Sequence, residues 1–66
     1  MVNGKLIRSE RKRLGLTQVE LGRLVGVGGD IISKYELGKL IPSVPSLQAL
    51  ARVFGMPMDE LCSEAA

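Results

Sequence analysis

The chain has 66 residues, 45% of them hydrophobic but only 3% aromatic, so it can form one small domain whose core must be aliphatic. It has one cysteine and no histidine, which excludes an internal disulfide. A metal site would have to rely on carboxylates, and the sequence shows no such cluster and no plausible nucleophile–base pair. No apolar run approaches the roughly 20 residues that cross a bilayer, and no signal-peptide pattern opens the chain. We therefore expect a cytoplasmic protein without a cofactor, a metal, a catalytic site or a membrane partner.

The net charge of +2 is unevenly distributed along the chain. Residues 1–39 hold eight Lys or Arg against four acidic residues, which gives +4, whereas residues 40–66 hold one Arg against three acidic residues, which gives −2. A basic half favours a polyanionic partner on that side of the protein. A solvated helix face would explain the basic residues about as well, so charge alone does not assign a function.

A first helix is expected over about residues 3–14. Asn3 is a suitable N-cap, and Gly15 stands just after the helix, where glycine is favoured. The inward stripe of this helix is expected to consist of Leu6, Ile7, Glu10 or Arg11, and Leu14.

Arg11 is the informative member of that stripe. It lies four residues after Ile7 and three before Leu14, so its side chain should lie at least partly against the core. A charge in that position needs a partner, and Glu36, near the end of the third helix, is the natural candidate. We therefore predict an Arg11–Glu36 ion pair that fixes the third helix against the first; otherwise Arg11 extends into solvent.

A second helix is expected over about residues 18–25. Thr17 and Glu20 have the spacing of a capping box, in which each side chain bonds a free amide of the first turn. The free amides at such a helix start form an anion site, where Gln18 either meets a phosphate or is simply a polar first-turn residue. The expected apolar face of this helix consists of Leu21, Leu24 and Val25.

A third helix is expected from residue 29 or 30 to residue 37. Together with the second helix it gives a helix-turn-helix pattern over about residues 17–37, and the second helix of that pattern can lie in the DNA major groove. Its inner side is expected to carry Ile32 and Tyr35, with Ile31 partly buried, and its outer side Gly29, Asp30, Ser33 and Lys34.

Two further helices complete the expected fold, an all-α domain of five helices that spans residues 1–66. The fourth helix should begin after Ser43 as its N-cap, carry Pro45 in its first turn and end at Gly55. The fifth should cover about residues 57–63. The core positions in this part of the chain are expected to be Leu47, Leu50, Ala51, Phe54 and Leu61.

Many residues stand at the spacings of a known family. They are Ile7-Arg8, Arg11, Gly15-Leu16-Thr17-Gln18, Leu21, Val25-Gly26-Val27, Ile32-Ser33-Lys34-Tyr35-Glu36, Gly38-Lys39, Pro42-Ser43, Leu47, Leu50-Ala51, Phe54-Gly55 and Asp59-Glu60-Leu61. With them the chain resembles the phage repressor and Cro type of helix-turn-helix domain (XRE-like), over nearly its whole length. The resemblance implies a third helix in the major groove of double-stranded DNA and binding as a two-fold homodimer, as in the family's known docking geometry. It places base reading on Gly29, Asp30 and Lys34 with Ser33 nearby, phosphate contacts on Gln18 and Lys39, and a buried ion pair on Arg11 and Glu36.

The start of the third helix departs from the family pattern. Gly28 stands where the family usually has a Ser or Thr cap, and Gly29 where it often has Gln or Arg. Asp30 either caps this helix or faces the groove, where it would accept a hydrogen bond from cytosine N4 but be repelled by phosphates. Lys34, donating to guanine O6 and N7, is then the best single candidate for base reading. Gly22 replaces the usual alanine and is expected to permit equally close helix packing at a cost of about 0.5–1 kcal/mol in helix propensity.

The connection before the fourth helix is a second departure, because Leu40 and Ile41 stand where the family often has basic residues. With Val44 and Met58 they either form part of a dimer contact or are ordinary exposed apolar residues.

The leading interpretation is a sequence-specific DNA-binding transcriptional regulator, repressor-like and without catalytic activity. The alternative is a protein-interaction or antitoxin-like module on the same fold, which would hold a protein partner through its acidic C-terminal half.

Overall fold

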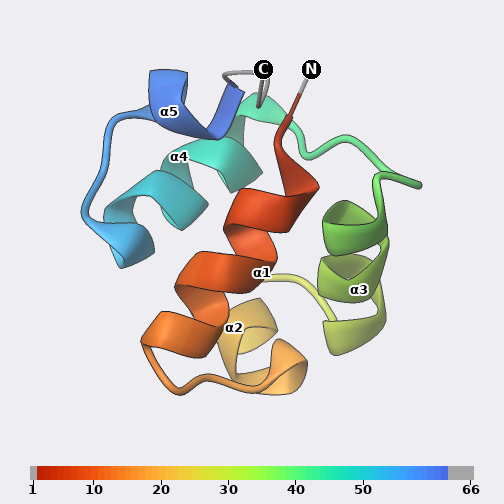
Figure 1. The fold of residues 1–66 in the computed structure, drawn as a ribbon. Helices are drawn as coiled ribbons and strands as arrows, with labels where there is room; N and C mark the ends of the chain where they lie inside the picture. The colour runs from red at the N-terminus through yellow and green to blue at the C-terminus, as the bar shows by residue number, and fades with distance from the viewer. Residues whose placement is uncertain (1, 63–66) are drawn as a thin grey trace.

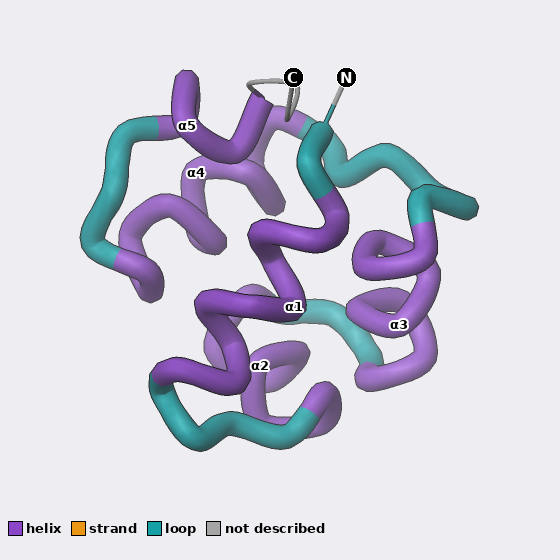
Figure 2. Tube along the Cα trace, viewed as in Figure 1, coloured by secondary structure: helices purple, strands orange, loops and turns teal. Residues whose placement is uncertain are grey.

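A computed structural model describes residues 2–62, which form helices joined by short loops, without a strand in that range (Figures 1 and 2). The helices are α1 (Gly4–Arg13), α2 (Gln18–Val25), α3 (Gly29–Leu37), α4 (Val44–Phe54) and α5 (Met58–Cys62). The prediction of an all-α fold with five helices is confirmed. The fifth helix begins one residue later than expected, and its expected last residue, 63, lies outside the described residues.

Side-chain caps define where the helices begin. The Asn3 carboxamide oxygen accepts a hydrogen bond from the Leu6 amide at 3.1 Å, and Ser43 caps α4 in the same way. At α2 the capping box is complete, since Thr17 Oγ1 accepts from the Glu20 amide at 3.0 Å and Glu20 Oε1 accepts from the Thr17 amide at 2.9 Å. The hydrogen bond from the Thr17 backbone lowers the pKa of Glu20 below its usual value. These local bonds fix the entry of the chain into three helices, as predicted.

The core is aliphatic apart from one tyrosine and one phenylalanine, Tyr35 and Phe54. α1 packs against α3, α4 and α5, while α2 packs against α3 and α4 (Figure 1). The amide of Asn3 donates to the carbonyl of Leu61 at 2.7 Å, which ties the chain before α1 to α5. The buried hydrophobic residues that form the core are Ile7, Leu21, Ile32, Tyr35, Leu47, Leu50, Ala51, Phe54 and Leu61.

Two leucines that were expected in the core lie on the surface instead. Leu14 is 39% exposed, because it is the C-cap residue beyond the last turn of α1. Leu24 is 57% exposed, because the buried face of α2 runs through Leu21 and Gly22 and so turns away from the position three residues after Leu21. The prediction that Leu24 belongs to the apolar face of the second helix is therefore wrong.

Two glycines permit unusually close helix packing. A Cβ on Gly22 would overlap the carbonyl oxygen of Val27 and lie 3.1 Å from the carbonyl carbon of Gly28. A Cβ on Gly4 would overlap the carbonyl oxygen of Tyr35. The expectation that glycine and alanine allow an equal approach at position 22 is therefore wrong for this backbone, since it has no room for the alanine methyl group.

No helix in residues 2–62 combines the length and the apolar character that a membrane span requires.

Candidate nucleic-acid interface

α2 and α3 are joined by a tight turn, and their first residues lie side by side. Gly26 adopts a left-handed conformation with φ of 89°, and the amides of Gly26 and Val27 both donate to the carbonyl of Gly22, at 2.7 and 2.9 Å. Gly29, at the start of α3, faces Val19 in the first turn of α2. A Cβ on Gly29 would lie 3.1 Å from the Val19 amide nitrogen. The turn therefore places the first turns of both helices on one surface.

The start of α3 has no side-chain cap. Gly28 is the N-cap residue and makes no capping hydrogen bond. Asp30 does not take over this task; the helix begins at Gly29, and Asp30 stays exposed in the first turn, where the helix dipole favours an acidic residue. A Cβ on Gly28 would overlap the Asp30 carboxylate. Of the two roles considered for Asp30, the structure does not support the cap.

The expected base-reading residues differ in how far they are exposed. Asp30 and Lys34 are exposed on the outer side of α3, whereas Ser33 and Gly29 are half-buried. A side chain at position 29 would lie against Val19, which is itself 53% exposed. Sequence reasoning missed Val19; its signal was an apolar residue in an otherwise polar first turn.

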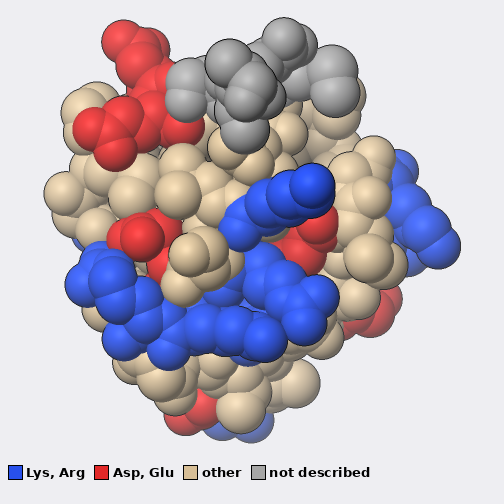
Figure 3. Space-filling model, viewed as in Figure 1, with Lys and Arg blue, Asp and Glu red and all other residues tan. Residues whose placement is uncertain are grey.

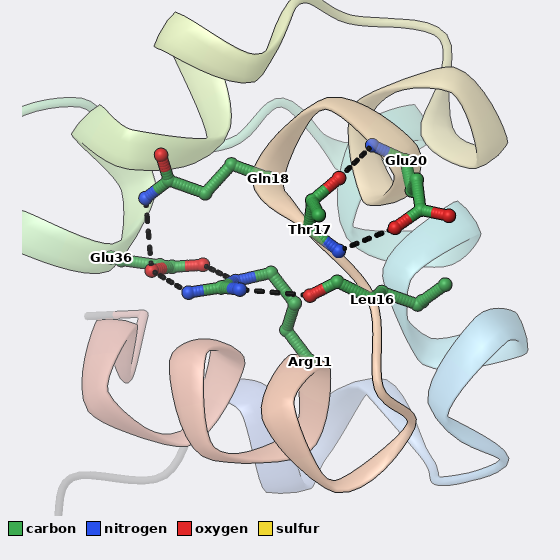
Figure 4. A network of polar contacts seen from close by, with 6 residues as sticks. All are labelled: Arg11, Leu16, Thr17, Gln18, Glu20 and Glu36. Carbon is green, nitrogen blue, oxygen red and sulfur yellow. Dashed lines mark hydrogen bonds and ion pairs between the residues drawn. The ribbon is translucent and has the colours of Figure 1, made fainter.

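Arg11, Glu36 and Gln18 form one polar network that joins three helices (Figure 4). Arg11 Nε donates to Glu36 Oε2 at 2.6 Å, and Arg11 Nη2 donates to Glu36 Oε1 at 3.2 Å. The third nitrogen of the guanidinium, Nη1, donates to the carbonyl of Leu16 at 2.8 Å. The Arg11 and Glu36 side chains are only 11% and 4% exposed. The structure thus contains the ion pair that the sequence predicts, in the bidentate geometry that is strongest for such pairs.

The network also fixes the orientation of the Gln18 amide. Gln18 Nε2 donates to Glu36 Oε1 at 3.3 Å, and this assignment is chemically required, because an ionised carboxylate can only accept hydrogen bonds. The Gln18 carbonyl oxygen therefore points away from Glu36 (Figure 4). An oxygen in that place cannot donate to a phosphate. The backbone N–H of Gln18 can, since it is the first in α2 and has no acceptor within the helix.

The end of α3 carries a cation and an apolar surface. Lys39 is exposed just after the C-cap Gly38, and its amide donates to the carbonyl of Lys34 at 2.9 Å.

Met58 is half-buried against the core, unlike the other three residues expected at a dimer contact. We define the α3–α4 apolar surface as Leu37, Leu40, Ile41 and Val44, which are 63%, 40%, 67% and 60% exposed.

The residues that the structure describes include no group of three or more Cys, Asp or Glu placed to hold a metal ion.

A capped α2, a glycine turn and an α3 with an exposed outer face define a helix-turn-helix domain. The family model described as helix-turn-helix matches residues 7–61, which is most of the chain. The chain therefore belongs to this helix-turn-helix family, and phage repressors are among its relatives.

Solved and curated proteins agree with this assignment. The chain is similar to the crystal structure of the P22 c2 repressor in complex with a synthetic operator, with a TM-score of 0.87 and 34% identity over 92% of each chain. It is 46% identical over 50 residues to an uncharacterized HTH-type transcriptional regulator of Methanothermobacter thermautotrophicus, covering 76% of this chain and 72% of that one. It is 34% identical over 61 residues to the HTH-type transcriptional regulator PuuR of Escherichia coli (strain K12), covering 92% of this chain and 33% of PuuR. The chain thus spans about a third of the length of that curated relative.

Proposed function

We propose that this chain is a sequence-specific transcriptional regulator, of the repressor type and without catalytic activity, that places α3 in the major groove of double-stranded DNA. The observation that carries the proposal is the two-sided character of α3. Ile32 and Tyr35 anchor one side in the core, while Asp30 and Lys34 stand exposed on the other. An α-helix fits the major groove of B-DNA and reads base edges with such exposed side chains. The similarity to a repressor solved on its operator supports the same role here.

The surface suggests a division of tasks among its residues. Lys34 is the reader of guanine, through O6 and N7, and Asp30 accepts from cytosine N4 where the adjacent phosphates permit it. Ser33 is half-buried and reaches at most the edge of the groove. Gly29 offers no side chain, so its contribution is close backbone approach. The phosphate contacts come from the backbone N–H of Gln18 and from Lys39.

Replacing Lys34 and Lys39 one at a time is expected to separate base recognition from phosphate binding. Lys34→Ala should remove about 1–3 kcal/mol of discrimination at one base position, because a bidentate contact to guanine is lost. Lys39→Ala should lower the affinity for all duplexes about equally and reduce the salt slope by about 0.9, because the lysine that neutralises a phosphate is lost. Titration of single-base variants of the preferred duplex at several salt concentrations measures both effects. A Lys34→Ala protein with an unchanged base profile would remove Lys34 as a reader.

We further infer that two copies of the chain meet through the α3–α4 apolar surface. The four exposed residues of this surface lie within eight positions of the chain, from the end of α3 to the start of α4. Exposed apolar groups that gather in this way mark protein–protein contacts. Because the surface begins at the end of α3, a two-fold contact there brings the two reading helices to adjacent half-sites on one side of the duplex. Half-sites for such dimers lie about 34–36 Å apart, one helical turn of DNA.

Ile41→Lys is expected to weaken this dimer, since it places a charge at the most exposed apolar position of the surface. Leu24→Lys is the matched control, because Leu24 is a comparably exposed leucine on α2, outside the surface. Sedimentation equilibrium should show a lower association constant only for Ile41→Lys, and affinity for a two-site palindrome should fall while affinity for one half-site is kept. Equal association constants for both variants and the unaltered chain would place the dimer contact elsewhere.

A further inference from the structure

Three basic residues on α1 have no part in the interface described above. Lys5, Arg8 and Lys12 are all exposed and follow one another at spacings of three and four residues, so they lie along one side of the helix. We call them the α1 basic stripe. Figure 3 shows the Lys and Arg side chains as a blue band across the molecule where α1 lies in Figure 1.

The charge of this stripe is not neutralised within residues 2–62. The ion pairs found there use other cations: Arg13 bonds Glu10 at 2.8 Å, and Arg11 bonds Glu36 at 2.6 Å. Glu10 on α1 and Glu36 on α3 are therefore occupied by cations outside the stripe. Three positive charges remain together on one exposed helix side, an arrangement that attracts a polyanion.

The α1 basic stripe borders the surface formed by α2 and α3. Gly4 packs directly against the backbone of Tyr35 in α3, and Arg11 reaches Glu36 in the same helix. Arg8 lies four residues after Gly4 and three before Arg11, so it stands on the flank of α1 that faces α3. Since Glu36 also receives the Gln18 amide, the start of α2 lies next to this flank.

We propose that the α1 basic stripe binds backbone phosphates of double-stranded DNA beside the segment that α3 reads. The proposal rests on the proposed function and adds a second, sequence-independent contact to it. From Lys5 to Lys12 the helix rises by about 10 Å, at about 1.5 Å per residue. Along the DNA axis that distance matches about three phosphates of one strand, which are about 3.4 Å apart. An anionic lipid surface would call for apolar side chains next to the cations, and the exposed large apolar residues of the described chain include none between Lys5 and Lys12.

The test compares the unaltered chain with the triple variant Lys5→Ala/Arg8→Ala/Lys12→Ala on two duplexes. One duplex contains the preferred sequence with several flanking base pairs on each side, and the other ends at the preferred sequence. On the long duplex the variant should lose about 0.9 of the salt slope for each phosphate contact removed, about 2–3 in all, while its base preferences are kept. On the short duplex the unaltered chain and the variant should differ little. Arg52→Ala, which removes one exposed cation from α4, is the control for net charge and should leave both slopes nearly unchanged.

Equal salt slopes for the unaltered chain and the triple variant on the long duplex would overturn the proposal. Thermal melting of both proteins keeps this result interpretable, because exposed substitutions of this kind should change stability by less than about 0.5 kcal/mol. A failure of the proposed function would give a different result, namely that the chain prefers no sequence. In that case the same comparison on a duplex of arbitrary sequence still tests the α1 basic stripe. Binding of the unaltered chain, but not the variant, to phosphatidylserine vesicles with no difference on DNA would assign the stripe to a lipid surface and contradict the proposal.

Discussion

Replacing Glu36 by alanine is expected to destabilise the domain by about 3–5 kcal/mol, because it leaves the charge of Arg11 buried without its partner. The Arg11 side chain is only 11% exposed and reaches no other acidic residue among the ion pairs of residues 2–62. A domain of this size is stabilised by about 0.05–0.15 kcal/mol per residue, so the loss is a large part of its whole stability. The variant also loses the partner of the Gln18 amide, which loosens the start of α2.

Urea unfolding at neutral pH measures this effect. Glu10→Ala is the matched control: it breaks an ion pair of similar length, 2.8 Å, that lies within α1 and whose Arg13 side chain is 56% exposed. Exposed pairs of this kind contribute about 0–1 kcal/mol. A double-mutant cycle with Arg11→Ala then isolates the interaction itself. Similar losses for Glu36→Ala and Glu10→Ala would show that the buried network does not fix α3 against α1.

Replacing Gly22 by alanine is expected to destabilise the domain by about 1–2 kcal/mol, although alanine is the better helix former. Helix propensity alone would stabilise the variant by up to about 1 kcal/mol. Overpacking a tight contact typically costs about 1–3 kcal/mol, and here the new methyl group meets the backbone of the turn before α3, which has little freedom to move. The loss should also shift α3 relative to α2 and so lower DNA affinity.

Ser9→Ala provides the reference for this experiment, because Ser9 is exposed in the middle of α1 and its replacement reports helix propensity without new contacts. Urea midpoints should move in opposite directions for the two variants. A Gly22→Ala protein that is more stable than the unaltered chain would contradict the close packing of α2 on the turn.

The features that sequence reasoning predicted correctly are those set by local chemistry. Asn3, Thr17 and Ser43 were predicted as caps because a cap involves only residues three positions apart. The Arg11–Glu36 contact was predictable for a different reason. A charge within an apolar stripe must find a partner, and few acidic residues were available in the first half of the chain.

The features that it missed depend on how the helices pack. The exposure of Leu24 follows from the rotation of α2 about its axis, which Gly22 sets through its contact with the turn. Val19 lies beside the start of α3 because Gly29, which has no side chain, packs against it. The orientation of the Gln18 amide follows from a carboxylate that is 18 residues away in the sequence. No local pattern contains this information.

Selection of bound sites from a pool of random duplexes at moderate salt tests the central claim most directly, because it reports reading by α3 and dimer symmetry together. We predict an enriched palindrome whose half-sites lie about one helical turn apart and include a guanine recognised through Lys34. A pool that shows no enriched sequence, although the protein is folded, would contradict the assignment of α3 as a reading helix.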